Sequence, residues 1–517
     1  MSRDLYNIAL DCVDKNAGSL ANKQKTALIL AGQTPKRLTF SHLEELTNRF
    51  ANILKDLGIL PGSRLILRAP NSPEFPVVFL GAVKAGVIPI PTSPLLTWHE
   101  LKFLLTDSEA SVLFTTKELL PPELFQHKPS GLSCVLVKSP KGEELPTGVL
   151  RFDELLYKAS PRFETRPTEA DLPAYWLYTS GTEGVPKGVI HAHRSIRAHD
   201  ARARLWQDLK EGDVVFNTSS LNWSYALTCG LLDVWHHGLT SLIYEGPPEP
   251  EILCKIVRDF QVTTFMSVPG IYRRLARYLK EEGGGFGSVR IALSAGEALD
   301  EEVRRTFHES TGLEIHGGLG MTEHSVYLVQ PFGKPIVPGS GVPLPGHRIA
   351  VLREDLSQAS PGEVGILASH RSCPGLMLGY HNRLEEEKRV FRGEWFLSDD
   401  LAKRDETGSI FFVGRRDDVI TAGGYRISPM EIESALNQSP EVAESAAVAT
   451  QFIRAFVVLK KGILPAEELR EKILAFASTQ LASYKMPRDI VFLKELPKTS
   501  NGKIKRKELK VVDLRSS

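Results

Sequence analysis

The stretch Tyr178-Thr-Ser-Gly-Thr-Glu-Gly-Val-Pro-Lys-Gly188 decides how the rest of this chain is interpreted. It follows the apolar run Ala174–Leu177, which predicts a strand. We therefore expect the segment at the carboxyl end of a strand, where open α/β sheets bind ligands. Its glycines permit positive φ and close backbone approach to an anion, while its hydroxyls and Lys187 suit a polyphosphate. A Walker loop is excluded, because Gly188 stands where that motif requires Ser or Thr.

Strand and helix signals alternate along most of the chain. Residues 38–57 predict an amphipathic helix, with Ser41 and Glu44 forming a capping box at its start. Such alternation indicates an α/β sheet covered by helices on both faces. The other elements expected are a strand at Arg64–Leu67, a helix from Ser72-Pro73-Glu74 to Gly86, a strand at Val87–Ile90, and strands near Trp176, Val215, Phe265, Ile291 and Ile315.

The pattern changes in two regions of the chain. His347–Leu356 and Glu363–Ser369 are short alternating runs, which predict antiparallel hairpins in a small β-barrel-like unit. The segment from His127 to Gly148 is rich in Pro, Gly and Ser and is expected to be a surface connection.

The last hundred residues form a mixed α+β stretch, with helices expected near Met430–Asn437 and Ala466–Gln480. We place a domain boundary at Arg416-Asp417. The predicted fold is an α/β protein with a large N-terminal domain of packed α/β sheets, residues 1–416, which includes the barrel-like unit. A small mobile α+β domain, residues 417–517, follows it.

Composition restricts the function classes. A chain of 517 residues is too long for one compact core, and 63 basic against 62 acidic residues provide no net field to attract nucleic acid or anionic lipid. The five cysteines are odd in number and never spaced as CxxC, which favours reduced thiols. No secretion signal is evident, and the apolar run Pro76–Pro91 is too short to span a bilayer. We expect a cytoplasmic enzyme, monomeric or homodimeric, without nucleic-acid or integral-membrane partners.

The phosphate-type loop resembles the signature [Y]TSG[ST]xGxPKG of the adenylate-forming superfamily. That superfamily contains acyl-CoA synthetases, luciferases and peptide-synthetase adenylation domains. Glu183 stands where Thr or Ser is commoner. Further motifs follow in the order of the family and cover nearly the whole chain: LSAGEAL at 293–299, HGGLGMTE at 316–323, WFLSDD at 395–400, GRRDDVI at 414–420, GGYRISPME at 423–431 and PKTSNGKIKR at 497–506.

The resemblance implies that these motifs share one nucleotide site. Glu323 and Thr182 would hold Mg²⁺, a hard cation that prefers oxygen ligands. Asp400 would bind both ribose hydroxyls, with Asp399 replacing the usual glycine before it. The residues expected at ATP or AMP are Thr179, Ser180, Gly181, Thr182, Gly184, Lys187, Gly296, Glu297, Ala298, Gly318, Leu319, Gly320, Met321, Thr322, Asp400, Phe412 and Arg415.

The same resemblance gives the small domain a part in two half-reactions. Lys503 would reach the carboxylate and the α-phosphate, and it forms the expected catalytic set with Lys187 and Glu323. Asp417 would be the pivot between the domains. The segment 445–459 lacks a loop usual in the family, so the small domain is trimmed. The residues expected on the coenzyme A side are Gly423, Gly424, Tyr425 and Arg426.

The resemblance implies an ATP-dependent carboxylic acid–CoA ligase. The acid would attack ATP to form an acyl-AMP and release pyrophosphate, and the thiol of coenzyme A would then displace AMP. Catalysis would depend on positioning and on stabilising charge. A stand-alone adenylation enzyme that loads a carrier protein is the alternative. An inactive ligand-binding paralogue is a third, although it would be expected to have lost Lys503 or Glu323.

The acid is expected to be aromatic or of short to medium length. Benzoate–CoA ligases share His191-Ala-His193 and the aliphatic Leu319, and medium-chain acyl-CoA synthetases are the competing subgroup. Trp223, Tyr225 and Ala226 are expected to line the acyl pocket, because flat rings favour flat apolar partners. Packing of Trp223 in the core is the alternative. The histidine pairs 191/193 and 236/237 lack further ligands at a useful spacing, so no metal site is expected there.

Overall fold

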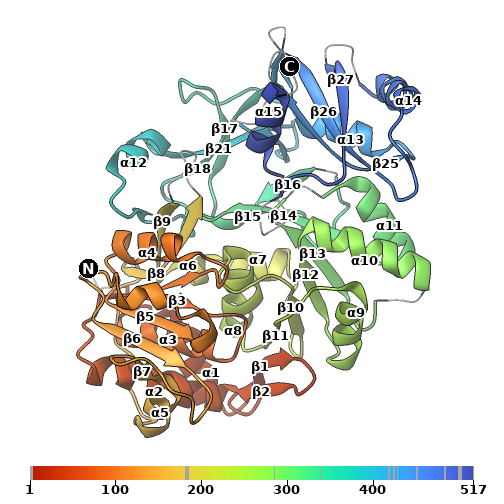
Figure 1. Ribbon diagram of the computed structural model, residues 1–517. Coiled ribbons are helices and arrows are strands. Elements are labelled where there is room, and N and C mark those ends of the chain that lie inside the picture. Colours follow the sequence, from red (N-terminus) through yellow and green to blue (C-terminus); the bar gives the residue numbers. More distant parts are fainter. Residues whose placement is uncertain are drawn as a thin grey trace.

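The computed structural model describes residues 4–180, 186–283, 286–297, 299–337, 339–416, 420–422, 425–427, 429–449, 452–481, 485–498 and 504–515. Two large sheets with helices between them form the body of the protein, and a smaller α+β unit follows (Figure 1).

The first large sheet contains five parallel strands. These are β3 (Arg64–Arg68), β4 (Ile88–Thr92), β5 (Val112–Thr116), β6 (Cys134–Lys138) and β7 (Leu150–Arg151). They lie in the order β4-β3-β5-β6-β7. The strands expected at Arg64 and Val87 are therefore confirmed. The expectation of a surface connection over 127–148 is wrong in part, because β6 is a buried apolar strand whose turn-rich flanks conceal it.

The second large sheet has 14 strands. They are β1 (Thr26–Ala31), β2 (Lys36–Thr39), β10 (Val214–Asn217), β11 (Thr240–Tyr244), β12 (Thr264–Ser267), β13 (Ile291–Ala295), β14 (Ile315–Met321), β15 (Ser325–Val329), β16 (Ser340–Pro343), β17 (Ile349–Leu352), β18 (Val364–His370), β20 (Phe391–Arg392), β21 (Trp395–Arg404) and β22 (Ile410–Arg415). The path runs β17-β18-β21-β22-β16-β15-β14-β13-β12-β10-β11-β1-β2, with β20 paired to β21. Strands β1 and β10 to β14 are parallel, as the alternation predicted.

The strand pairing corrects the prediction of a small β-barrel-like unit. The hairpins expected from His347 to Ser369 exist, since β17 pairs antiparallel with β18. In the described residues, however, β15 to β18 and β20 to β22 continue the large sheet instead of closing a barrel. The amphipathic alternation of a strand is the same in both arrangements, so the sequence pattern does not separate them.

Alternating side chains assign the two faces of each sheet to different cores. Leu65 and Leu67 of β3 belong to the core between the sheets, and Ile66 belongs to the outer one. In β10, Val215 faces the central core and Phe216 the opposite core. Helices α2, α3 and α8 contribute to the central core, α4 covers the outer face of the five-stranded sheet, and α9 to α11 cover the outer face of the large sheet (Figure 1).

The helices of this body begin and end largely where the sequence indicated. Helix α3 ends before Gly86, which has φ +76° and is suited to a left-handed cap. The capping box at Ser41 and Glu44 is wrong, because Thr39 caps α2 by accepting from His42 N at 3.2 Å. The helical bounds are η1 Leu10–Asp14, α1 Lys15–Gly18, α2 Phe40–Asp56, α3 Glu74–Ala85, α4 Trp98–Asp107, η2 Lys117–Leu119, η3 Pro122–Phe125, α5 Phe152–Lys158, α6 Ser195–Ala198, α7 Asp200–Leu205, η4 Tyr225–Leu232, α8 Asp233–His236, α9 Pro250–Asp259, α10 Pro269–Glu282, α11 Glu301–Thr311 and α12 Leu384–Val390.

The strands that flank the phosphate-type loop form a separate sheet. Strand β8 (Pro173–Ser180) pairs antiparallel with β9 (Pro186–Ala192), which pairs with β19 (Gly379–Tyr380). The expectation that the loop leaves a strand of an open α/β sheet is therefore wrong. Only five residues separate Ser180 from Pro186, which suffices for a hairpin, whereas a parallel crossover needs a dozen or more.

The carboxyl-terminal unit has its own small cores. Its elements are β23 (Ile420–Ala422), β24 (Tyr425–Ile427), α13 (Pro429–Asn437), β25 (Val442–Ala449), β26 (Ile453–Leu459), α14 (Glu467–Ser478), β27 (Asp489–Leu493) and α15 (Arg506–Arg515). Apolar side chains of α13 and α14 cover one face of the β25-β26-β27 sheet, and Leu509 of α15 covers the other. Ala449 pairs with Ile453, so β25 and β26 join through a tight connection, as the missing loop predicted.

Two further expectations concern the chain as a whole. None of the helices in the described residues is long and apolar enough to cross a membrane. All five cysteines are free and buried.

Candidate active site

Lys187 lies near the start of β9, opposite Thr179 of β8. Its ammonium group forms an ion pair with Glu386 of helix α12 and lies 5.0 Å from the centre of the Tyr380 ring. Glu386 also accepts from Arg389 at 2.8 Å. These two cations, Arg389 first, lower the pKa of Glu386 to about 2. The charge of the predicted phosphate-binding lysine is therefore matched by a carboxylate of the protein.

Glu323 lies in the turn between β14 and β15, and Tyr380 holds it in place. The Tyr380 hydroxyl donates to Glu323 Oε1 at 2.8 Å, and Met377 N donates to the Glu323 carbonyl at 2.8 Å. Burial, followed by the Glu323 carboxylate, raises the pKa of Tyr380, so this hydroxyl keeps its proton and remains a donor. Tyr380 thus contacts both Lys187 and Glu323, which sequence analysis expected in one site. Its own part escaped prediction because it lies in no recognised motif.

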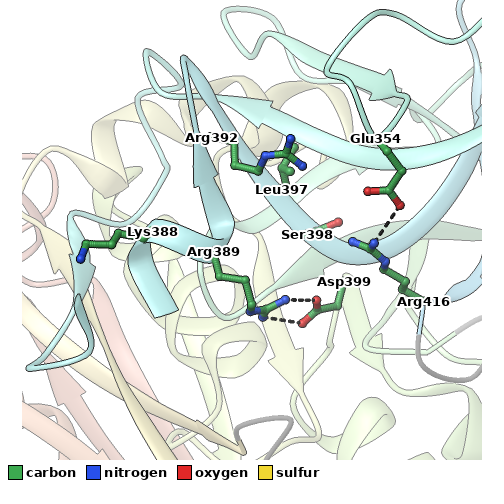
Figure 2. Close-up of a pocket in the computed structure, with 8 residues that line it drawn as sticks. All are labelled: Glu354, Lys388, Arg389, Arg392, Leu397, Ser398, Asp399 and Arg416. Atoms are coloured by element: carbon green, nitrogen blue, oxygen red, sulfur yellow. Dashed lines mark hydrogen bonds and ion pairs between the residues drawn. The ribbon is translucent and has the colours of Figure 1, made fainter. Parts of the chain in front are cut away.

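Asp399 and Asp400 are neighbours on β21, but they have different main partners. Asp400 is buried, pairs with Arg415 of β22 at 3.2 Å, and donates a hydrogen bond from its backbone N–H to Ser398 Oγ at 3.1 Å. Asp399 instead accepts from Arg389 at 3.0 Å and lies 3.6 Å from Arg415. The acid that replaces the usual glycine therefore has a partner, Arg389, as Figure 2 shows.

These contacts connect the parts of the predicted nucleotide site into one network. It runs from Lys187 through Glu386, Arg389 and Asp399 to Arg415 and Asp400. A cavity of about 340 Å³ adjoins it and is bordered by Arg389, Arg392, Asp399 and Arg416 among others (Figure 2). Residues separated by more than 200 positions in the chain are thereby held in fixed relation.

The motifs at 293–299 and 316–323, both expected at ATP or AMP, lie at neighbouring strand ends. Gly296 and Glu297 follow β13, and Gly318, Leu319, Gly320 and Met321 belong to β14, which pairs with β13. Gly320 is required by close packing, because a Cβ there would lie 2.2 Å from the carbonyl oxygen of Ser325. Thr322 follows β14, and Phe412 lies half-buried on β22. The structure thus places both predicted motifs at one edge of the parallel sheet.

The three residues predicted to line the acyl pocket differ in burial. Tyr225 opens the π-helical segment η4, and its hydroxyl donates to Leu293 O at 3.3 Å. Ala226 is buried in the core between the sheets. Trp223 is 40% exposed, so the alternative that it packs in the core is excluded. A π-helical segment is frequent at functional sites, which fits a ligand beside Tyr225.

Trp206 is the aromatic residue that sequence analysis missed. It is fully buried, its Nε1 donates to His316 O at 3.1 Å, and its ring centre lies 6.2 Å from that of Tyr225. A Cβ on Gly318 would lie 2.7 Å from Trp206 Cζ2, so Gly318 leaves space for this ring. Trp206 follows a short helix with no motif around it, and only the tertiary structure shows its contact with β14.

Some predicted site residues lie outside the described residues, and three more are described through their backbone alone. Tyr425 and Arg426 lie on β24, and Ser180 ends β8. Lys498 and Ile504 form an isolated bridge on either side of the predicted catalytic lysine. The calls outside the described residues are Gly181, Thr182, Gly184, Ala298, Asp417, Gly423, Gly424 and Lys503.

Comparison with protein families identifies the class. Residues 16–381 match the family described as AMP-binding enzyme, and residues 431–503 match the AMP-binding enzyme C-terminal domain. Because the first match covers more than half of the chain, the chain belongs to the AMP-binding enzyme family.

Individual relatives refine this assignment. Benzoate–CoA ligase from Thauera aromatica is 34% identical, over 98% of this chain and 96% of its own. Acetyl-coenzyme A synthetase from Bacillus subtilis (strain 168) is 33% identical, over 98% and 91%. A crystal structure of an anthranilate CoA ligase in complex with anthranoyl-AMP superimposes with a TM-score of 0.90, at 30% identity and 99% and 98% coverage. The predicted family, and an AMP-forming acid–CoA ligase as its activity, are confirmed.

Proposed function

We propose that this protein activates an aromatic or short to medium-chain carboxylic acid with ATP and transfers the acyl group to coenzyme A. The observation that carries the proposal is the connected network of Lys187, Glu386, Arg389, Asp399, Arg415 and Asp400. It joins the residues expected at the phosphates to those expected at the ribose. An adenylation reaction needs both ends of ATP held while the α-phosphate is attacked.

The triphosphate must take the place of Glu386 at Lys187, since both are anions that compete for one ammonium group. Lys187 then stabilises the charge that moves onto pyrophosphate when the acid attacks the α-phosphorus. Asp400 accepts from the ribose hydroxyls, and Arg415 holds its carboxylate in place. Catalysis on this side therefore depends on charges that the protein positions in advance.

The donor set fits Mg²⁺. Glu323 offers a carboxylate, with Thr182 as the second proposed ligand, and hard oxygen ligands are those that Mg²⁺ prefers. Tyr380 fixes Glu323 through Oε1. When bound, the ion would supply countercharge to the phosphate oxygens.

The small unit supplies the remaining groups. In this proposal residues 417–517 form a mobile domain, Asp417 is its pivot, and Lys503 reaches the carboxylate and the α-phosphate. Gly423, Gly424, Tyr425 and Arg426 face coenzyme A after the rotation. Matching motif positions and the Lys498–Ile504 bridge, which frames the segment carrying Lys503, support this assignment.

An aromatic acid is favoured by the rings of Trp206 and Tyr225. Their ring centres are 6.2 Å apart, and Trp206 packs against Gly318, a residue expected at the nucleotide. Bulky rings shorten a pocket and favour flat partners through offset or edge contacts. The similar benzoate and anthranilate ligases point the same way, whereas medium-chain acids remain the second candidate. We further propose a cytoplasmic monomer or homodimer.

Acid-dependent exchange of labelled pyrophosphate into ATP tests the first half-reaction. Benzoate should support exchange in the wild-type enzyme, and Lys187→Ala should reduce the rate by about 100-fold. A matched control is Lys334→Ala, because Lys334 is an exposed lysine outside the predicted site, so its loss should leave the rate unchanged. Absence of exchange with every acid tried would refute adenylation. Thioester formation with free coenzyme A then separates the ligase from an enzyme that loads a carrier protein.

A further inference from the structure

A cluster of metal-binding side chain types lies where helix α7 meets helix α8. Asp200 is the first residue of α7, His236 is the last residue of α8, and His237 follows it. One ligand atom from each lies within 4.8 Å of the others. Within the described ranges, no other group of three or more His, Cys, Asp or Glu residues meets this criterion. The three side chains are exposed by 25, 15 and 27%, so small ions can reach them.

The spacing of the ligand atoms suits a tetrahedral cation. His237 Nε2 lies 3.3 Å and His236 Nε2 lies 3.8 Å from the same oxygen, Asp200 Oδ1. Zinc bound at about 2.0–2.1 Å places neighbouring tetrahedral ligand atoms about 3.3 Å apart. Among the residues that the structure describes, His237 Nε2 is buried and has no hydrogen-bond partner, although it lies 3.3 Å from Asp200 Oδ1, so this nitrogen is available to a cation.

A carboxylate behind the cluster completes a recurrent metal-site arrangement. His236 Nδ1 contacts Asp11 of η1, which also accepts from Tyr6 at 2.7 Å and from Lys15 at 3.3 Å. A histidine that binds a metal through one nitrogen usually donates its other N–H to a carboxylate or carbonyl, which fixes the ring and its tautomer. Asp11 thus directs His236 Nε2 toward Asp200.

The Asp200 carboxylate offers negative charge to a cation, and one of its oxygens already has another partner. Arg204 contacts Asp200 through Oδ2, the oxygen that does not face the imidazoles, and is 73% exposed. Arg204 can therefore keep its contact with Oδ2, or move into solvent, when Oδ1 binds an ion.

We propose that Asp200, His236 and His237 bind one Zn²⁺, with water in the fourth position. Sequence spacing gave no such site, because Asp200 lies 36 residues before His236 and only the packing of α7 on α8 unites them. The ion would connect η1, α7 and α8 at one point. Helix α7 leads directly into Trp206, so the site would restrain the backbone that positions this ring.

Titration of the chelator-treated full-length protein with ZnCl₂, followed calorimetrically, tests the site. We expect one Zn²⁺ per chain, and His237→Ala should weaken binding by at least about 100-fold. His308→Ala is the matched control, because His308 is also a histidine 3.2 Å from a carboxylate, that of Glu314, but has no third ligand. It should bind Zn²⁺ as the wild type does.

Two further variants separate a metal site from a folding effect. Asp200→Asn keeps the side-chain shape and should weaken binding strongly. Asp11→Asn leaves all three ligands and should weaken it by about 10–100-fold, the usual effect of a lost outer partner. Wild-type protein without stoichiometric binding, or equal affinities of the His237→Ala and His308→Ala proteins, would overturn the proposal. Zinc affinity does not depend on ligase activity, so the outcome is independent of the proposed function.

Discussion

The nucleotide side and the acyl side of this enzyme are built from different materials. On the nucleotide side, Lys187, Glu386, Arg389 and Asp399 form a chain of alternating charges. On the acyl side, the rings of Trp206 and Tyr225 carry no charge and fix their positions through single hydrogen bonds to backbone carbonyls. In the proposed function, the first arrangement recognises a constant cosubstrate by charge, and the second selects an acid by shape. Substitutions on each side should therefore affect different kinetic constants.

The largest effect is expected from the lysine proposed to serve only adenylation. Lys503→Ala should lower acyl-AMP formation by about 100- to 1000-fold, because a charge that stabilises the transition state is lost. Thioester formation from supplied benzoyl-AMP and coenzyme A should remain close to wild type. Single-turnover measurements of the two half-reactions check this. Equal losses in both would contradict a small domain that presents different groups to each step.

The two aspartates of β21 should differ in a graded way. Asp400→Ala should raise the KM for ATP by about 10- to 100-fold, because the ribose loses a charged acceptor. Asp399→Ala should act more weakly, since Asp399 contacts Arg389 and Arg415 rather than the proposed ribose position. The KM for the acid should stay within about twofold in both variants. A larger effect of Asp399→Ala on the KM for ATP would show that the assignment is displaced by one residue.

Substitutions on the acyl side should change the preference among acids and leave the KM for ATP unchanged. Trp206→Ala should raise the kcat/KM ratio of decanoate to benzoate by about 10-fold, because removing the ring lengthens the pocket, and leave the KM for ATP unchanged. Trp206→Phe is the control for loss of folding, because it keeps an aromatic ring, and it should produce a smaller change in the same direction. Tyr225→Ala is also expected to favour longer chains. A Trp206 variant that changes the KM for ATP but not the preference for acids would break the separation of the two sides.

The smallest effect concerns the carboxylate that occupies Lys187. Glu386→Gln should lower the KM for ATP by about two- to fivefold, because the phosphates no longer compete with a negative charge for this lysine. Glu385→Gln is the matched control on the same helix, since Glu385 pairs with the exposed Lys388 at 2.7 Å. Its KM for ATP should not change. An increase in the KM of Glu386→Gln would mean that Glu386 mainly positions Lys187.

The contrast also explains what the sequence could predict. The residues proposed to bind the nucleotide occur in contiguous motifs, so Glu323 and Asp400 could be proposed from the sequence, which also predicted most helix and strand positions. Trp206, Tyr380 and Glu386 lie in no motif and gain their roles by packing against segments more than 50 residues away, or about 200 in the case of Glu386. The antiparallel pairing of β8 with β9 was missed for a related reason, because a strand pattern does not reveal its partner.

Steady-state thioester formation by the wild-type enzyme, with ATP, free coenzyme A and either benzoate or decanoate, tests the account most directly. Product identity is established by mass spectrometry, and AMP is measured alongside it. We predict benzoyl-CoA, one AMP per thioester, and a higher kcat/KM for benzoate than for decanoate. A preference for decanoate would contradict the aromatic pocket, and acyl-AMP accumulation without any thioester from free coenzyme A would contradict the CoA ligase itself.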